Sequence, residues 1–464
     1  MTPPPQIPRS RSPTARRVAS VLLTIALFTS LGACARYRSL PLETLPASLQ
    51  APDPVALSQD ARNIDRPYLR PVAIDLSRPL DANAIAVIAV LANPDLQALR
   101  VRAGVADAQV FAAGLLPDPT FSLGIDTIVA GPPAASNIAG ALGLGLAALR
   151  TRGAVRAQAQ AAARQVRLDL AWAEWQTAGQ ARLQAERVIG LERSVVLLTS
   201  SRDAAQSLLG RKLRASGRGD LMPDQVEAAR LSAFDAADRL RIAERDLSAA
   251  RSELIRLLGL PPGFQLWLAP SPYAPPRGQA AELFVVAARV RLDLKALEAG
   301  YGAQEAAVRK AILDQFPTLD LTVNASRDTG RNTLLGPAIA FTLPLWNRNR
   351  GGIAIATATR AALNAEYGAR LARTRADIAA AIDAIAIVQR QRAAILTDLP
   401  ALEKFAAASR RAANRGDLAL ATAETAEAAL RDKQLLLVQA ERDGAEQSIA
   451  LELLTGTLKE SWPQ

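Results

Sequence analysis

The chain of 464 residues contains no histidine, one cysteine and two methionines, and only 4% of its residues are aromatic. The absence of histidine removes the commonest general base and the commonest metal ligand. With so little cysteine and methionine, a soft-metal site is not expected either. No nucleophile elbow, phosphate-binding loop or carboxylate dyad stands out, so the sequence predicts a protein that is not an enzyme and has no metal or cofactor.

Residues 1–33 have the pattern of a lipoprotein signal peptide. Four arginines between positions 9 and 17 precede an apolar segment, Val18 to Ser30, that is too short to span a bilayer comfortably. The segment leads to Leu-Gly-Ala-Cys, which resembles a bacterial lipobox, and Cys34 is its acylated cysteine. The alternative is a core cysteine after an ordinary signal peptide. Ala35, in place of an aspartate, favours sorting to the outer membrane by resemblance to other lipoproteins.

The chain is basic, with a formal charge of +11. Removal of residues 1–33 takes away four arginines and no acids, which leaves +7, from 51 basic and 44 acidic residues. A basic chain can bind nucleic acid, but these arginines are spread among acids without basic blocks. We therefore expect solvated helical faces and no nucleic-acid partner.

An internal duplication organises the chain from Asp81 onward. Residues 34–80, which are rich in proline, are expected to form an extended arm that runs from the lipid anchor across the surface of the body. Four short motifs then recur in the same order at an offset of 197 or 198, which indicates a tandem repeat. The motifs begin at Asp95 and Asp293, Pro119 and Pro317, Arg218 and Arg415, and Ala243 and Ala440.

The predicted repeats are 81–258 and 280–458, joined by a proline-rich linker, 259–279, and followed by a tail, 459–464. Each repeat is expected to contain a helix, a two-stranded hairpin, a long helix and a return helix. The expected ranges are 81–115, 119–130 with 136–148, 152–214 and 223–258, and then 280–314, 317–327 with 333–345, 349–413 and 419–455. A helix of sixty residues is about 90 Å long, too long for one globular core, and alanine-rich stripes favour coiled-coil packing.

The second hairpin alternates between apolar and small residues. Leu335, Ile339 and Phe341 share one face, whereas Gly336 and Ala338 belong to the other. Such strands suit a transmembrane barrel, but soluble hairpins show the same pattern, so these residues alone leave both locations open. Four strands cannot close a barrel, because bacterial membrane barrels start at eight. Three copies would supply twelve strands and gather the long helices into a tube.

The lipobox, the strand start at Pro317, the strand end from Phe341 to Trp346 and the helix opening from Asn347 to Gly351, in a duplicated chain, resemble the TolC-type outer-membrane efflux protein family. The Leu343 to Gly351 segment looks most like the branch that serves heavy-metal RND pumps. The resemblance implies a mainly α protein with transmembrane β-strands: a homotrimer with a twelve-strand outer-membrane barrel continuous with a periplasmic helical barrel.

The same resemblance implies a passive exit duct, lipid-anchored in the bacterial outer membrane, with outer-membrane lipid around it. It would dock to a periplasmic adaptor (membrane fusion) protein and an inner-membrane RND-type pump. Metal, drug, solvent and polypeptide all remain open as cargo. The alternative reading is a lipid-anchored periplasmic coiled-coil scaffold or secretion-assembly protein without a pore.

In the family, the two Arg-Gly-Asp-Leu turns would lie at the periplasmic entrance, closed by polar contacts and touched by the adaptor. The candidate gate or adaptor contacts are Arg218, Asp220, Asp224, Arg415, Asp417 and Glu424. The alternative is that the aspartates of the two turns cap the return helices. The family's gate aspartates lie further into the return helix, where this chain has Thr422 and Glu424. We expect charge reversal at Arg415 to raise the conductance of the purified channel.

Aromatic residues lie near the expected strand ends: Phe121, Phe316, Phe341 and Trp346. They are expected either to form part of an interfacial aromatic girdle or to pack where the strands meet the helices.

Overall fold

The computed structural model describes residues 37–42, 51–127, 129, 137–270, 274–327 and 332–462. The chain divides into two units, 1–49 and 50–464. In the first unit, the described residues 37–42 are exposed and contain no helix or strand. All the elements below belong to the second unit.

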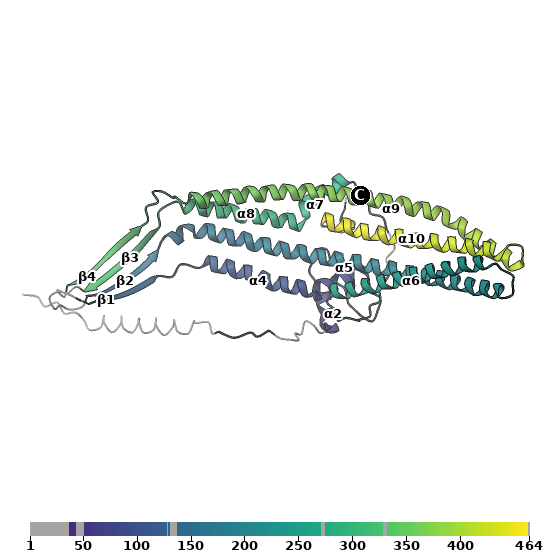
Figure 1. Cartoon of the computed structure of the whole chain (residues 1–464). Coiled ribbons are helices and arrows are strands. Elements are labelled where there is room, and N and C mark those ends of the chain that lie inside the picture. The colour runs from purple at the N-terminus through teal and green to yellow at the C-terminus, as the bar shows by residue number, and fades with distance from the viewer. Residues whose placement is uncertain are drawn as a thin grey trace, which may run out of the picture. The chain divides into compact units, whose positions relative to one another are not determined.

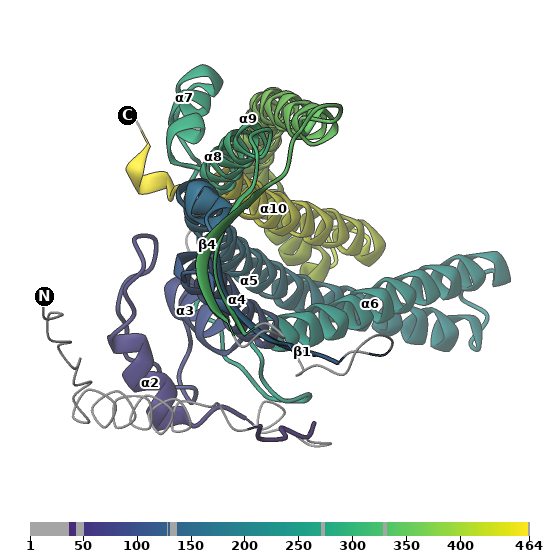
Figure 2. The same ribbon diagram turned by 90° about the vertical axis from the view of Figure 1, so that its left-hand side faces the viewer.

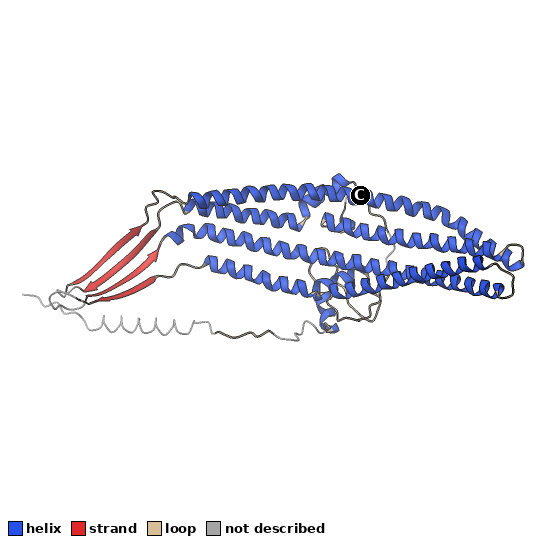
Figure 3. Ribbon diagram, viewed as in Figure 1, coloured by secondary structure: helices blue, strands red, loops and turns tan. Residues whose placement is uncertain are grey.

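Both repeats contain the predicted succession of helix, hairpin, long helix and return helix (Figures 1 and 3). The first repeat consists of α3 (Ala82–Ala92), α4 (Pro94–Gly114), β1 (Thr120–Asp126), β2 (Asn137–Gly145), α5 (Ala147–Ser216) and α6 (Pro223–Leu257). The second consists of α7 (Ala280–Val290), α8 (Leu292–Leu313), β3 (Leu319–Arg327), β4 (Thr333–Phe341), α9 (Arg350–Arg415) and α10 (Leu420–Thr455), followed by the short η2 (Lys459–Ser461).

The four strands form one antiparallel sheet in the order β1-β2-β3-β4. The helices beside the sheet keep the same order, because α4 packs on α5, α5 on α8, and α8 on α9. Farther from the sheet, α6 and α10 take the places of α4 and α8, and the order becomes α6, α5, α10, α9. Figure 2 shows these helices and the sheet following one curved layer. This layer has two open edges, one at β1, α4 and α6 and the other at β4 and α9.

The long helices exceed the predicted lengths, with 70 residues in α5 and 66 in α9. Each therefore extends for about 100 Å. They run from the sheet to two turns at the opposite end of this unit, where the return helices begin (Figure 1). Among the described residues, no single helix meets the length and hydropathy test for crossing a membrane, and the bent pair of α3 and α4 meets it by length and composition only.

The prediction of an extended surface arm is wrong for residues 54–80. Helix α2 (Pro54–Arg62) forms within this range, begun by the Asp53 carboxylate, which accepts a hydrogen bond from the Val55 N–H. The side chains of Leu57 and Leu69 are buried in the core cluster around α3, α5 and α6. The reason is that apolar residues recur between the prolines, and their burial outweighs the extended preference of proline-rich sequence.

The predicted helix 280–314 is also wrong as a single element, because the chain breaks at Arg291 between α7 and α8. The equivalent break in the first repeat, at Asn93 and Pro94, carries a proline, which does not continue a helix. Residue 291 lies 198 positions after residue 93, so the two breaks occupy equivalent positions in the two repeats.

Each break is joined to the end of a return helix. In the first repeat, the Asn93 Nδ2 donates to the carbonyl oxygen of Leu257, at the end of α6 (2.9 Å). In the second, the Arg291 Nη1 donates to the carbonyl oxygen of Leu454, near the end of α10 (2.6 Å). A glycine with positive φ follows each return helix, Gly259 (63°) and Gly456 (74°). We call these two places the first joint and the second joint.

Candidate functional site

The register of the sheet gathers large apolar side chains on one face. Directly paired residues of neighbouring strands share a face, and Phe121 pairs with Leu142, which pairs with Val323. The exposed members of this apolar face are Phe121, Leu123, Ile125, Ile138, Leu142, Leu144, Leu319, Leu321, Val323, Leu335, Ile339 and Phe341. So large an apolar face, exposed in a single copy, indicates contact with a membrane or a protein partner.

The opposite face of the sheet is small and polar. It carries Ser122, Gly143, Thr322 and Asn324, and Leu334 is the one large apolar side chain among the described residues of this face. The hydroxyl of Thr322 donates to the carbonyl oxygen of Ala338 on the neighbouring strand (3.2 Å). An apolar face and a polar face separated by one strand thickness are what a lipid-facing wall with a wet interior requires.

Among the described residues, the outer strands leave the sheet unfinished, because β1 pairs only with β2 and β4 only with β3. Each free edge presents backbone N–H and C=O groups without strand partners. An open edge does not occur in the hydrocarbon region of a bilayer. The sheet therefore needs a further β-edge before its apolar face can lie in lipid.

At the other end of the long helices, each Arg-Gly-Asp turn contains its own ion pair. The Arg218 Nε lies 2.9 Å from an Asp220 carboxylate oxygen, and the Arg415 Nε lies 2.8 Å from that of Asp417. All four side chains are more than half exposed. The capping alternative for both aspartates is wrong, because the N-cap residues are Met222 and Ala419, neither with a side-chain cap. Each aspartate lies two residues before the N-cap position and is held by the arginine two residues before it.

The other predicted contacts lie on two helical hairpins, one formed by α5 and α6 and the other by α9 and α10. Asp224 accepts a hydrogen bond from the N–H of Gln225 in the first turn of α6 (2.9 Å). Glu424 lies on α10, and its largely buried carboxylate pairs with Arg211 of α5. Glu424, in the hairpin of α9 and α10, is thus paired with the hairpin of α5 and α6. Among the described residues, the ion pair of each Arg-Gly-Asp turn stays within that turn. Cys34 lies outside the described residues.

Arg211 belongs to a ladder of ion pairs along α5 and α10 that the sequence analysis missed. Arg182 pairs with Glu452 (2.7 Å) and Arg193 with Glu441 (2.9 Å). From one ion pair to the next, the number of residues along α5 equals the number along α10 to within one residue. This spacing is expected for two antiparallel helices packed side by side. Every cation of these pairs is an arginine of the first repeat and every anion a glutamate of the second, but their pairing depends on how α5 aligns with α10.

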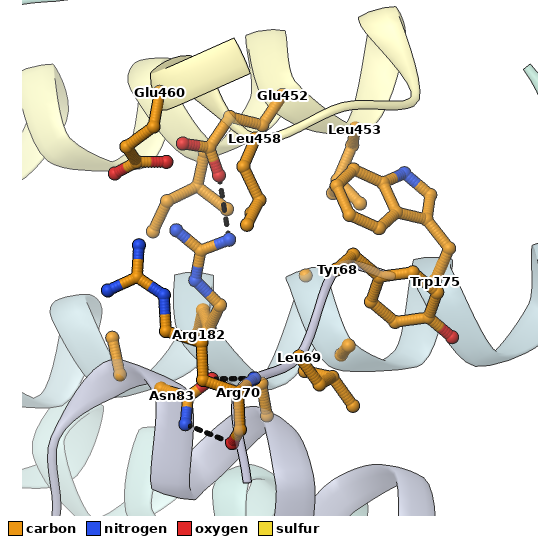
Figure 4. A pocket seen from close by; sticks show the side chains of 15 residues that line it. Tyr68, Leu69, Arg70, Asn83, Trp175, Arg182, Glu452, Leu453, Leu458 and Glu460 are labelled. Carbon is orange, nitrogen blue, oxygen red and sulfur yellow. Dashed lines mark hydrogen bonds and ion pairs between the residues drawn. The ribbon is translucent and has the colours of Figure 1, made fainter. Parts of the chain in front are cut away.

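Glycines bring α5 and α10 close together along this ladder. A Cβ at Gly179 would overlap the Leu453 side chain, and one at Gly190 would lie 2.7 Å from the side chain of Arg442. Near Gly179, a cleft of about 170 Å³ opens between residues 68–70, α5 and the end of α10. Figure 4 shows the Arg182 to Glu452 pair spanning this cleft, with Tyr68 and Trp175 beside it. The two repeats therefore pack closely at these glycines, and toward the turns Arg211 and Glu424 join the two hairpins.

Residues 284–457, from α7 to the end of α10, match the family model described as outer membrane efflux protein. This part of the chain is therefore similar to outer membrane efflux proteins. The match falls on the second repeat, and the first repeat has the same succession of elements. The match supports a role as the outer-membrane channel component of an efflux system.

Solved structures of outer-membrane channels have the same fold. The Campylobacter jejuni CmeC channel is 13% identical, with a TM-score of 0.68 over 91% of this chain and 95% of that one. The Vibrio cholerae outer membrane protein VceC is 16% identical (TM-score 0.65, covering 81% and 96%). The Neisseria gonorrhoeae MtrE channel, solved in its open state, is 17% identical (TM-score 0.60, covering 80% and 88%). The search of curated protein sequences gave no match.

Proposed function

We propose that three copies of this efflux protein associate edge to edge and close their sheets into one twelve-strand barrel in the outer membrane. The observation that carries the proposal is the sheet, with an apolar face, a small polar face and two free edges in one copy. Two copies would reach the eight strands of the smallest bacterial barrels, whose interior is filled by side chains. Three copies supply a wider ring, which leaves room for a passive duct continued by the helices.

The turns at the far end of α5 and α9 form the periplasmic entrance of this duct. The Arg211 to Glu424 pair ties the two helical hairpins of one copy together near their tips. We propose that this pair holds the entrance narrow, because it joins α5 to α10 beyond the tight glycine seam. The pairs Arg218 to Asp220 and Arg415 to Asp417 fix the shape of the turns that the periplasmic adaptor contacts.

The duct is proposed to work with a periplasmic adaptor and an inner-membrane pump of the RND type, which supplies the energy. The Leu343 to Gly351 segment supports the heavy-metal branch of such systems. Acylation of Cys34 is proposed to anchor each copy in the outer membrane in addition to its strands. The lipobox sequence supports this anchor.

The assembly is tested with full-length protein extracted in detergent. Its native mass should be that of a trimer, and it should produce discrete conductance steps in planar bilayers. The Cys34→Ser variant should still need detergent, because the apolar sheet face remains. A monomer that stays in solution without its acyl chain and gives no conductance would refute the barrel and favour the periplasmic scaffold.

The entrance is tested by charge reversal at matched positions. Arg211→Glu should raise the mean conductance, because it places two carboxylates together between the hairpins. Arg410→Glu is the control, since Arg410 pairs with Glu427 inside one hairpin and should change conductance little. Arg415→Glu probes the turn itself. Equal conductance for wild type and Arg211→Glu would remove this pair from the entrance.

A further inference from the structure

The two places where a strand leads into a long helix have the same arginines but use them differently. Arg150 and Arg152 follow β2, and Arg348 and Arg350 follow β4, at the offset of 198 that relates the repeats. The duplication therefore placed one pair of arginines at each junction, and the first pair shows what such residues do when the protein itself supplies their partners.

At the first junction, both side chains are bound within the chain. Arg150 donates to the carbonyl oxygens of Pro317 (2.8 Å) and Phe316 (3.3 Å), and its guanidinium lies over the Phe316 ring. Arg152 donates to the carbonyl oxygen of Gly114. These contacts fasten α5 to the start of the second hairpin and to the end of α4.

At the second junction, the arginine side chains make fewer contacts among the described residues. The Arg348 Nε makes one long contact, 3.3 Å, to the carbonyl oxygen of Pro344. Within the described residues, neither Arg348 nor Arg350 has a carboxylate partner, and both are exposed. No aspartate or glutamate occurs between Asp328 and Glu366 in the sequence, although the chain has 44 acids in 464 residues. The junction is thus locally cationic.

The backbone of this junction is held in an unusual conformation. Arg348 (φ 44°) and Asn349 (φ 50°) are the two non-glycine residues with positive φ among the described residues. The Asn349 Nδ2 fixes the turn by donating to the carbonyl oxygen of Ala311 on α8 (2.8 Å). Left-handed residues cost free energy and tend to occur where a structure uses the resulting geometry.

An exposed aromatic side chain lies close to these arginines in the sequence. Trp346 is 86% exposed, and Leu343 and Leu345 are also mostly exposed. These residues follow Phe341, the last residue of β4, in the sequence. Exposed tryptophan at the border of an apolar band, with cations just beyond it, is the arrangement that the surface of a bilayer favours.

We propose that Trp346, Arg348 and Arg350 form a binding site for the phosphate headgroup of anionic phospholipid in the membrane leaflet nearest the helices. This inference rests on the proposed insertion of the sheet into the membrane. Trp346 lies at the boundary between headgroups and acyl chains, and the two guanidiniums donate to the phosphate oxygens. The first junction has no equivalent site, because its arginines are already bound.

The binding is measured by native mass spectrometry of the detergent-purified protein titrated with phosphatidylglycerol or phosphatidylcholine. The double variant Arg348→Gln, Arg350→Gln should bind phosphatidylglycerol about fivefold more weakly for each arginine removed. Binding of phosphatidylcholine should change much less. The matched control, Arg150→Gln with Arg152→Gln, should lower thermal stability and leave the preference for phosphatidylglycerol intact. Equal phosphatidylglycerol binding by wild type and the first double variant would overturn the proposal.

The position of Trp346 gives a second, independent readout. In vesicles of phosphatidylglycerol with brominated acyl chains, wild-type tryptophan fluorescence should be quenched, and Trp346→Phe should lose most of the quenching. Trp267 is the control, because it is also exposed (61%) but lies in the linker between the repeats. Quenching that survives in Trp346→Phe and is lost in Trp267→Phe would contradict the site.

Conductance separates this inference from the proposed channel. The Arg348→Gln, Arg350→Gln variant should still conduct in phosphatidylcholine bilayers, because it retains the sheet and the helical duct. Wild type that conducts without any preference for phosphatidylglycerol refutes the lipid site alone. Wild type that neither conducts nor inserts refutes the channel itself, and the lipid site with it.

Discussion

The first and second joints have the same geometry and different chemistry. The first joint uses a neutral amide, Asn93, which is 3% exposed. The second uses Arg291, whose guanidinium makes a two-bond contact with Asp293 (2.9 and 2.8 Å) and lies over the Trp172 ring. Arg370 of α9 also reaches Asp293 (3.2 Å). The second joint therefore connects α5, α8, α9 and α10, whereas the Asn93 side chain connects only α4 and α6.

This difference shows how a duplicated chain can diverge in its sensitivity to change. A buried ion pair is costly to desolvate and costly to break, because the remaining charge has no water around it. An amide that loses its partner leaves a smaller penalty. The second joint should consequently be the place where single substitutions do most damage.

Removal of the buried charge gives the largest expected effect. Arg291→Ala leaves the Asp293 carboxylate, 7% exposed, with Arg370 as its only ion-pair partner among the described residues, and should lower the unfolding free energy by about 3–5 kcal/mol. Asn93→Ala should cost about 1–3 kcal/mol. Thermal melting of the purified protein, followed by circular dichroism, ranks the two. A greater loss from Asn93→Ala would reverse the comparison.

Substitution of the glycine at each joint, Gly259 or Gly456, compares the two joints through the backbone rather than through a side chain. Alanine in the left-handed conformation costs about 1–2 kcal/mol at either position. At Gly259 the new Cβ would also collide with the carbonyl oxygen of Ala92, whereas at Gly456 it would lie 3.0 Å from the Cγ of Arg291, a less severe contact. Gly259→Ala should therefore melt at the lower temperature. Identical melting temperatures would show that the first joint yields as easily as the second.

The first repeat has its own buried carboxylate, and its effect should depend on pH. Burial raises the pKa of Glu174, but hydrogen bonds from Arg66 (2.6 Å) and Arg100 (2.7 Å) outweigh it and hold the pKa below its usual range. This stabilisation is present above the ordinary glutamate pKa, about 4.3, and is lost as the pH falls through the lowered value. Glu174→Gln should cost about 2 kcal/mol near pH 7. The difference from wild type should shrink below about pH 4, and a difference that grows in acid would exclude this pair as its source.

The ion pairs of the two turns should give the smallest effects. Asp220→Ala and Asp417→Ala each remove an exposed pair, worth about 0–1 kcal/mol. Melting temperatures of both variants should stay near that of wild type. A clear loss for only one of them would show that its turn, unlike the other, is held by contacts between copies.

The duplication, the alternation of the strands and the succession of helices along the chain could be predicted, because short motifs and apolar patterns in the sequence carry them. Pro94 marks the break in the first repeat, but an arginine carries no such signal, so the break at Arg291 was missed. Asp220 and Asp417 have the residue type of a cap, yet the cap positions fall two residues later, which only the geometry of the turn decides. The pairing of Arg211 with Glu424 depends on how α5 and α10 align, and local sequence patterns do not contain that alignment.

The free edges of the sheet also determine when this protein can enter a membrane. A single copy can complete its helices, whose hydrogen bonds are local, but the outer edges of its β1 and β4 have no strand partner among the described residues until other copies arrive. The helical part can therefore mature first in water and serve as the platform on which copies meet. Insertion then becomes a collective event whose rate depends on protein concentration, and a solitary copy must be shielded from aggregation while it waits.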